Sequence, residues 1–293
     1  MRAIASYRAV VKRALHGFIE DRGPSMGAAL AYYTLFSLAP LLLIVIALVG
    51  GVFGGDAARG QIVAQISGLV GAEAAAAIEQ LIVSADQPTT GWMATCLGVV
   101  LMLVGATTVL AELQSAMDHI WRAPTPPARN GLWALLRSRL LSFGLILGVG
   151  FLLIVSLVVS AGVAAFNAWW SPWFGAWRAV GVALDLVVHF SLLTALFAMI
   201  YKWLPRVRVA WRDVLVGAAC TALLFVLGRA MIGLYIGISS VASVFGAAGS
   251  VVVVMVWIYY SAQIFLIGAE FTWAYSQILG SSRPQAAPQP SPS

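Results

Sequence analysis

Five ionisable side chains lie inside long apolar stretches of the sequence: Glu112, Asp185, His189, Arg229 and Glu270. Charged groups are costly in such surroundings, so where they occur they pair with one another or bind an ion or a substrate. A rise of about 1.5 Å per residue places Asp185 and His189 at a depth similar to that of Arg229. Two interpretations are open. In the first, Asp185 or His189 forms an ion pair with Arg229 that fixes the packing of two helices. In the second, Arg229 binds an anion in a polar pathway, and Asp185 and His189 gate this pathway or balance the charge.

The two glutamates lie near the ends of their apolar stretches rather than in the middle. Depth alone places Glu112 and Glu270 within reach of Lys202, Arg206 or Arg212. Both are candidates for charge relay or gating, and the alternative is that they extend to the membrane interface and only support the packing.

A run of small residues follows Arg229 and leads into the last apolar stretch. A backbone without bulky side chains leaves N–H groups accessible, and a helix N-terminus beside an arginine attracts anions such as phosphate or carboxylate. A small-residue turn packed beneath an outer loop has the same composition. The candidate substrate-binding residues are Arg229, Ser239, Ser240, Ser243, Gly246, Gly249 and Ser250.

The elements that must position these residues are membrane helices. The chain is 61% apolar and 10% charged, against about 45–50% and about 25% in soluble domains, which excludes a soluble globular protein, a disordered protein and a disulfide scaffold. A bilayer core takes roughly 20 apolar residues of helix. We therefore predict an all-α, polytopic membrane helix bundle, with a membrane domain at 28–280 and six transmembrane helices near 28–53, 92–112, 140–166, 180–204, 214–237 and 251–275.

The placement of lysine and arginine predicts the orientation. Most of them lie before the first predicted span and in the loops that follow the second and fourth spans, so both termini are expected in the cytoplasm. Residues 1–27 are expected to form a basic amphipathic helix on the anionic inner leaflet, or to act only as a positively charged anchor. Apolar spacing in the loop at 54–91 predicts amphipathic helices that rest on the outer surface or cap the bundle, and the polar, proline-rich segment 281–293 is expected to be disordered.

Signatures of catalysis are missing from the sequence. His16, His119 and His189 lie far apart, and neither a P-loop nor a nucleophile elbow occurs. We therefore expect no enzyme activity, no catalytic residue, no metal site and no cofactor. The net charge of +6 is explained by the orientation signal, so no nucleic-acid partner is expected, and the GxxxG spacings permit a homo-oligomer.

Four stretches of the sequence resemble the YihY/BrkB family of bacterial inner-membrane proteins. They are AYYTLFSLAPLLLI, ELQSAMDHIW, YKWLPRVRVAWRDVLVGA and the long C-terminal stretch from GRAMIGLYIGISS to FLIGAEF. Phe245 stands where the family pattern would have a tyrosine. The resemblance implies a six-span, multi-pass protein of the bacterial inner membrane and a link to virulence.

The resemblance adds three expectations about function. Movement of lipids or lipid-linked envelope precursors, suggested for some relatives, agrees with Arg229 beside a small-residue break. This makes a transporter or flippase of an anionic, lipid-like substrate the leading expectation, with membrane lipids and an anionic headgroup as partners. A non-catalytic scaffold with an envelope-assembly partner is the alternative. The historical family label ribonuclease BN fits the residues poorly, because no metal cluster or nucleophile faces water.

Overall fold

A computed structural model describes residues 2–53, 59–60, 62–64, 66–67, 72–85, 108–124, 162, 178–238 and 248–282. All regular structure among these residues is helical, which confirms the all-α class for this part of the chain. Predicted span 140–166, apart from residue 162, and most of 92–112 lie outside the described residues. The helices are α1 (Arg2–Glu20), α2 (Gly23–Phe53), α4 (Ala72–Ala85), α7 (Arg178–Trp203), α8 (Trp211–Ile238) and α10 (Gly249–Ile278), and residues 108–120 are also helical.

Three of the described helices are long and apolar enough to cross a membrane. Their apolar segments are Leu186–Trp203, Trp211–Tyr235 and Gly249–Ile278, which coincide with the predicted spans 180–204, 214–237 and 251–275. Helix α2 covers the predicted first span at 28–53. The number of six spans and the cytoplasmic position of both termini stay predictions.

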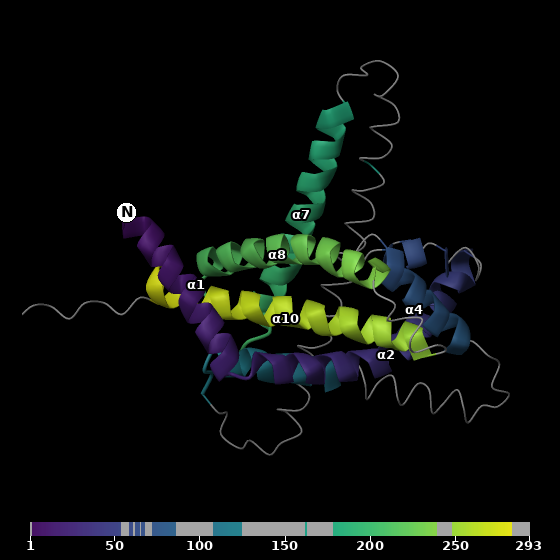
Figure 1. The fold of residues 1–293 in the computed structure, drawn as a ribbon, viewed down its shortest axis with the longest axis horizontal. Coiled ribbons are helices and arrows are strands. Elements are labelled where there is room, and N and C mark those ends of the chain that lie inside the picture. Colours follow the sequence, from purple (N-terminus) through teal and green to yellow (C-terminus); the bar gives the residue numbers. More distant parts are fainter. Residues whose placement is uncertain are drawn as a thin grey trace, which may run out of the picture.

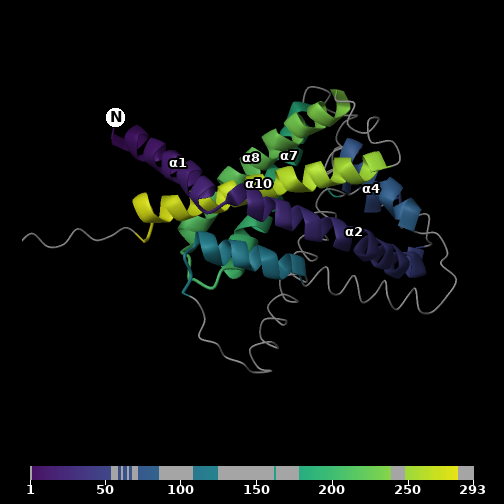
Figure 2. The same cartoon turned by 60° about the horizontal axis from the view of Figure 1, so that its bottom comes forward.

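Helix α10 lies at the centre of the bundle and packs against α1, α2, α4 and α8 (Figure 1). Helices α8 and α10 run in opposite directions, and α7 packs against α8. Helix α1 crosses α10 near the C-terminus of α10, whereas α4 lies beside the N-terminal part of α10 (Figure 2). The bundle therefore has an α1 end and an α4 end, and the basic residues at the α1 end make it the predicted cytoplasmic end.

Each end of the bundle has its own apolar core. At the α4 end, Ile78 and Ile82 of α4 are buried against Ala31 of α2 and Val253 and Ile258 of α10. This packing confirms that the segment at 54–91 contributes a helix that caps the bundle. At the α1 end, the core joins α1, the helix at 108–120, α7, α8 and α10, and its most buried members include Val10, Met117, Ile120, Tyr201 and Leu266.

Glycines bring α8 and α10 close together. A side chain at Gly217 of α8 would meet the hydroxyl of Thr272, and one at Gly268 of α10 would meet the hydroxyl of Thr221. Both threonines turn these hydroxyls back to their own helix, donating to the carbonyl oxygens of Gly268 and Gly217 at 2.7 and 2.8 Å. Small residues at such positions let membrane helices approach closely, which stabilises them by van der Waals contact.

A buried tyrosine joins three of the helices. The Tyr201 hydroxyl of α7 donates to the carbonyl oxygen of Phe265 in α10 at 2.8 Å and lies 3.1 Å from the Thr221 hydroxyl of α8. Tyr201 is fully buried. Because a polar group in apolar surroundings needs a partner, this hydroxyl favours one relative position of α7, α8 and α10.

Helix α1 has two apolar faces rather than one. Val10, Ala14 and Gly17 are buried against the bundle. A second stripe points away from it, formed by Tyr7, Val11, Leu15 and Ile19, which are 47–72% exposed. One apolar face therefore docks α1 onto the bundle, and the other lies on its outer side.

Candidate functional site

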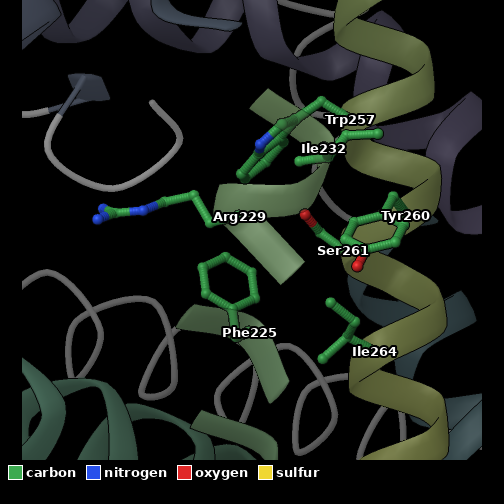
Figure 3. Close-up of a pocket in the computed structure, with 7 residues that line it drawn as sticks. All are labelled: Phe225, Arg229, Ile232, Trp257, Tyr260, Ser261 and Ile264. Atoms are coloured by element: carbon green, nitrogen blue, oxygen red, sulfur yellow. The ribbon is translucent and has the colours of Figure 1, made fainter. Parts of the chain in front are cut away.

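Arg229 lies on α8 within the apolar segment Trp211–Tyr235, and its side chain is exposed in the described bundle. It borders a hollow between α8 and α10 that is lined by Phe225 and Ile232 of α8 and by Trp257, Tyr260, Ser261 and Ile264 of α10. Figure 3 shows the guanidinium extending away from α10, while the Ser261 hydroxyl points from α10 toward α8. The arginine thus lies at the rim of the hollow, with polar groups of α10 behind it.

The remaining predicted binding residues are described only in part. Gly249 and Ser250 form the first residues of α10, where Gly249 is buried and Ser250 half-buried. Ala248 precedes them and provides no side-chain hydrogen bond to cap the helix, and the first turn holds no acidic residue. The backbone N–H groups at this N-terminus therefore have no side-chain cap from Ala248. Ser239, Ser240, Ser243 and Gly246 lie outside the described residues.

The predicted gating residues lie in three different helices. His189 is exposed on α7, and Asp185 lies one turn earlier in the same helix, where its side chain falls outside the described part of the chain. Glu112 is half-buried in the helix at 108–120. Only Glu270 of this set is fully enclosed by the described part of the protein, and it defines a second site at the α1 end.

Glu270 is 1% exposed, although it carries a carboxyl group. Its side chain faces α1 at Gly17, where a Cβ atom would lie 2.6 Å from Oε2 of Glu270. Among the described residues, neither carboxyl oxygen of Glu270 receives a hydrogen bond from a donor group. A buried carboxyl group without a donor is unusual, because burial removes the water that would otherwise solvate it.

A second carboxyl group lies beside Glu270. Asp21, just beyond the end of α1, is within hydrogen-bonding reach of it, and the Oδ2 atom of Asp21 is likewise buried without a donor among the described residues. The other oxygen of Asp21 lies 3.6 Å from Nε2 of His119. Two carboxyl groups this close can share one proton, which then supplies the donor that both lack.

Two arginines border this carboxyl pair. The guanidinium groups of Arg13 and Arg122 lie 5.3 and 4.9 Å from the ring centre of Trp273, and both act electrostatically on Glu270. Arg122 adopts a left-handed backbone conformation, with φ of 50°, just after the helix at 108–120. We call this group the α1-end cluster, and it consists of Arg13, Asp21, His119, Arg122, Glu270 and Trp273.

Two of the three basic residues predicted within reach of Glu270 have other partners. Lys202 donates instead to the carbonyl oxygen of Val209 and lies 5.4 Å from the ring centre of Trp211. Arg206 pairs with Asp118, with 3.3 Å between Nε and Oδ2. Depth along a helix does not tell which neighbour a residue faces, and Glu270 points toward α1 and the end of the 108–120 helix.

Sequence reasoning missed five members of the cluster, namely Arg13, Asp21, His119, Arg122 and Trp273. They lie outside or at the edges of the apolar stretches, where charged and aromatic residues are common and carry no signal of their own. The one available sign was Asp21, an acidic residue among basic ones at the start of the first predicted span. Its partner Glu270 is near the other end of the chain, so no spacing rule connects them.

Metal binding has little support in the described residues. They contain no group of three or more His, Cys, Asp or Glu side chains close enough to hold a metal ion. The carboxyl pair of Asp21 and Glu270 is suited to a proton, which needs only two oxygens. The rim of Arg229 is suited to an anion, because a guanidinium binds phosphate or carboxylate groups through several donors.

The fold and these two sites define a helical membrane protein with ionisable groups in its apolar helices. The family described as virulence factor BrkB matches residues 14–292, and the chain belongs to this family.

Named relatives agree with this assignment. A UPF0761 membrane protein of Pseudomonas aeruginosa strain LESB58 is 31% identical over 259 residues, which cover 87% of this chain and 59% of the relative. UPF0761 membrane proteins of Alcanivorax borkumensis and Tolumonas auensis are 32% and 26% identical, covering 88% and 90% of this chain and 58% and 86% of the relatives. The chain thus spans about three fifths of the length of the Pseudomonas and Alcanivorax relatives. No solved structure matches it.

The names of the family and of these three relatives describe a virulence factor and membrane proteins rather than an enzyme. Together with the three apolar helices, they identify the chain as a membrane protein.

Proposed function

We propose that this protein moves an anionic, lipid-like molecule or an envelope precursor between the leaflets of the bacterial inner membrane. Arg229 binds the anionic headgroup during the passage. Asp185, His189, Glu112 and Glu270 relay or balance charge as the substrate moves, and both termini lie in the cytoplasm.

The observation that carries this proposal is the position of Arg229. An arginine in the apolar segment Trp211–Tyr235 of α8 is costly in a lipid environment, yet its side chain is exposed in the described bundle and is not enclosed by it. A headgroup that passes along α8 would meet the guanidinium at mid-height while its acyl chains stay in the lipid. The exposed apolar neighbours Leu227, Met231 and Leu234 suit such chains.

Two further features support an anion on this path. The Ser261 hydroxyl of α10 points toward α8 beside the hollow that Arg229 borders (Figure 3). At the α4 end, α10 begins without a side-chain cap from Ala248, so N–H groups at Gly249 and Ser250 are suited to an anionic headgroup. The predicted residues Ser239, Ser240, Ser243 and Gly246 would add hydroxyl and N–H donors to the same end.

The test is lipid translocation by the purified protein in vesicles of phosphatidylglycerol and phosphatidylethanolamine. A fluorescent phosphatidylglycerol is placed in both leaflets, and the fraction that an impermeant quencher reaches is followed with time. We expect wild-type protein to expose lipid from the inner leaflet and Arg229→Ala to lose this activity. Leu223→Ala, on the same helix and also exposed, is the matched control and should keep it.

Two outcomes would contradict the proposal. One is Arg229→Ala protein that moves lipid at the wild-type rate. The other is folded, inserted wild-type protein that moves none of the fluorescent phosphatidylglycerol. If Arg229→Ala fails to fold while activity per folded molecule is kept, the arginine is structural.

A scaffold in envelope assembly is the second candidate. The outer stripe of α1, with Tyr7, Val11, Leu15 and Ile19, is exposed and apolar, and a partner helix could cover it. Replacing Val11 and Leu15 by serine would then release a copurifying envelope protein without affecting lipid movement. Loss of lipid movement with no change in copurifying proteins would argue against the scaffold.

A further inference from the structure

We infer that Asp21 and Glu270 form a proton-binding site that fastens α1 to α10, and that loss of the shared proton loosens α1 from the bundle. This inference concerns the α1-end cluster and does not depend on lipid movement. It rests on the closeness of the two carboxyl groups, on their burial and on the lack of any donor for three of their four oxygens among the described residues.

Helix α1 encloses Glu270. The carboxyl group is 1% exposed and faces the bare backbone of Gly17. No side chain at this point of α1 separates the carboxyl group from the helix, so α1 itself forms the lid over Glu270. Because α1 is part of the enclosure, its movement away would let water reach the carboxyl group, and solvation of a charge on Glu270 is thus coupled to the position of α1.

The carboxyl oxygens indicate the kind of ligand. Three of them are buried without a donor among the described residues, and one proton shared between the two groups forms a hydrogen bond that involves two of these three oxygens. A metal ion needs more ligands, and the described residues hold no group of three or more acidic, His or Cys side chains that could supply them. The site therefore fits a proton.

Charged groups from three segments surround the pair. Asp21, at the end of α1, and Arg13 of α1 act on Glu270, and Arg122 acts on it from the segment at 108–124. His119 of that segment faces the outer oxygen of Asp21 at 3.6 Å. With the proton present, both guanidinium groups rest over Trp273, and the cluster keeps α1, α10 and the 108–124 segment together.

Removal of the proton changes these contacts. Two neighbouring carboxylates then repel each other, and this repulsion is relieved when α1 moves and admits water. Arg13 and Arg122 attract the charged carboxylates and oppose this movement in part. Alkaline conditions should therefore favour a looser α1, and acidic conditions a docked one.

The first test asks whether the proton is there. Infrared difference spectra of the protein in lipid vesicles, recorded between mildly acidic and mildly alkaline pH, report the carbonyl band of protonated carboxyl groups. We expect a band that titrates in wild-type protein, disappears in Glu270→Gln and is altered in Asp21→Asn. Glu112→Gln removes a half-buried carboxyl group outside the cluster and should leave the band in place. A band unchanged in both Glu270→Gln and Asp21→Asn would overturn the inference.

The second test asks whether the proton controls α1. Spin labels are placed at exposed positions 15 and 115, as Leu15→Cys on α1 and Ser115→Cys on the 108–120 helix, with Cys96 and Cys220 replaced. We expect a narrow distance distribution at acidic pH and a longer, broader one at alkaline pH. In Glu270→Gln, position 270 carries no charge that needs solvation, so the narrow distribution should persist at both pH values. Identical distributions of the wild-type protein at both pH values, or a narrower one at alkaline pH, would overturn the inference.

Discussion

Glu270 and Arg229 are both ionisable residues in membrane helices, but the side chain of Glu270 is buried and that of Arg229 is exposed. Glu270 is enclosed by α1 and the 108–124 segment, and its oxygens lack donors among the described residues. Arg229 is exposed on α8, with its guanidinium extending away from α10. The difference indicates that the α1 end holds helices together, whereas Arg229 lies at the surface of the described part of the bundle.

This contrast separates two kinds of substitution. Changes at the α1 end should lower the free energy of unfolding, because they disturb buried contacts between several helices. Changes at Arg229 should leave stability nearly unchanged and act on substrate movement.

The largest loss of stability is expected for Gly17→Leu. A Cβ atom at this position already lies 2.6 Å from Oε2 of Glu270, so a leucine must push α1 off α10. Overpacking of this kind destabilises by about 3 kcal/mol, which thermal unfolding in detergent would detect. Ala9→Leu places the same side chain at an exposed position of α1 and should change little. Equal stability of the two variants would show that α1 is not docked as described.

A smaller loss is expected for Tyr201→Phe. The substitution removes the hydroxyl that donates to the carbonyl oxygen of Phe265, at a site that is fully buried. We expect a loss of about 1 kcal/mol in the free energy of unfolding. Tyr235→Phe is the control, because Tyr235 is 55% exposed on α8. If Tyr235→Phe costs as much, the hydrogen bond between α7 and α10 is not the cause.

A still smaller effect is expected for Asp118→Asn. Asp118 accepts a hydrogen bond from the backbone N–H of Arg206 at 2.9 Å and pairs with its side chain, but the Arg206 side chain is 47% exposed. Solvent screening limits the expected loss to about 0.5 kcal/mol, and high salt should reduce the difference from wild type. Glu20→Gln breaks an exposed contact with His16 and should have no measurable effect. A loss in Asp118→Asn that is insensitive to salt would contradict this interpretation.

The apolar helices could be predicted from the sequence because length and composition alone determine whether a segment can cross a bilayer. This is why the spans at 180–204, 214–237 and 251–275 coincide with α7, α8 and α10. The same reasoning marked Glu270 as unusual, since few glutamates lie in such stretches. It also predicted a helical cap, which α4 provides with Ile78 and Ile82.

The partners of Glu270 could not be predicted in this way. The depth of a residue follows from its position along a helix, but the direction it faces depends on how helices pack around each other. Lys202 and Arg206 lie at a suitable depth and yet contact Val209 and Asp118. The close contact between Gly17 and Glu270 could not be predicted from the sequence either, because it depends on how α1 packs against α10.

The most direct test of the account is the charge at position 229. Lipid translocation in vesicles and thermal unfolding are measured together for wild type, Arg229→Lys and Arg229→Gln. The account predicts that all three unfold within about 0.5 kcal/mol of one another, as expected for an exposed residue, that Arg229→Gln loses translocation and that Arg229→Lys keeps part of it. Wild-type translocation by Arg229→Gln would contradict headgroup binding. A loss of several kcal/mol in its stability would instead make Arg229 part of a buried ion pair.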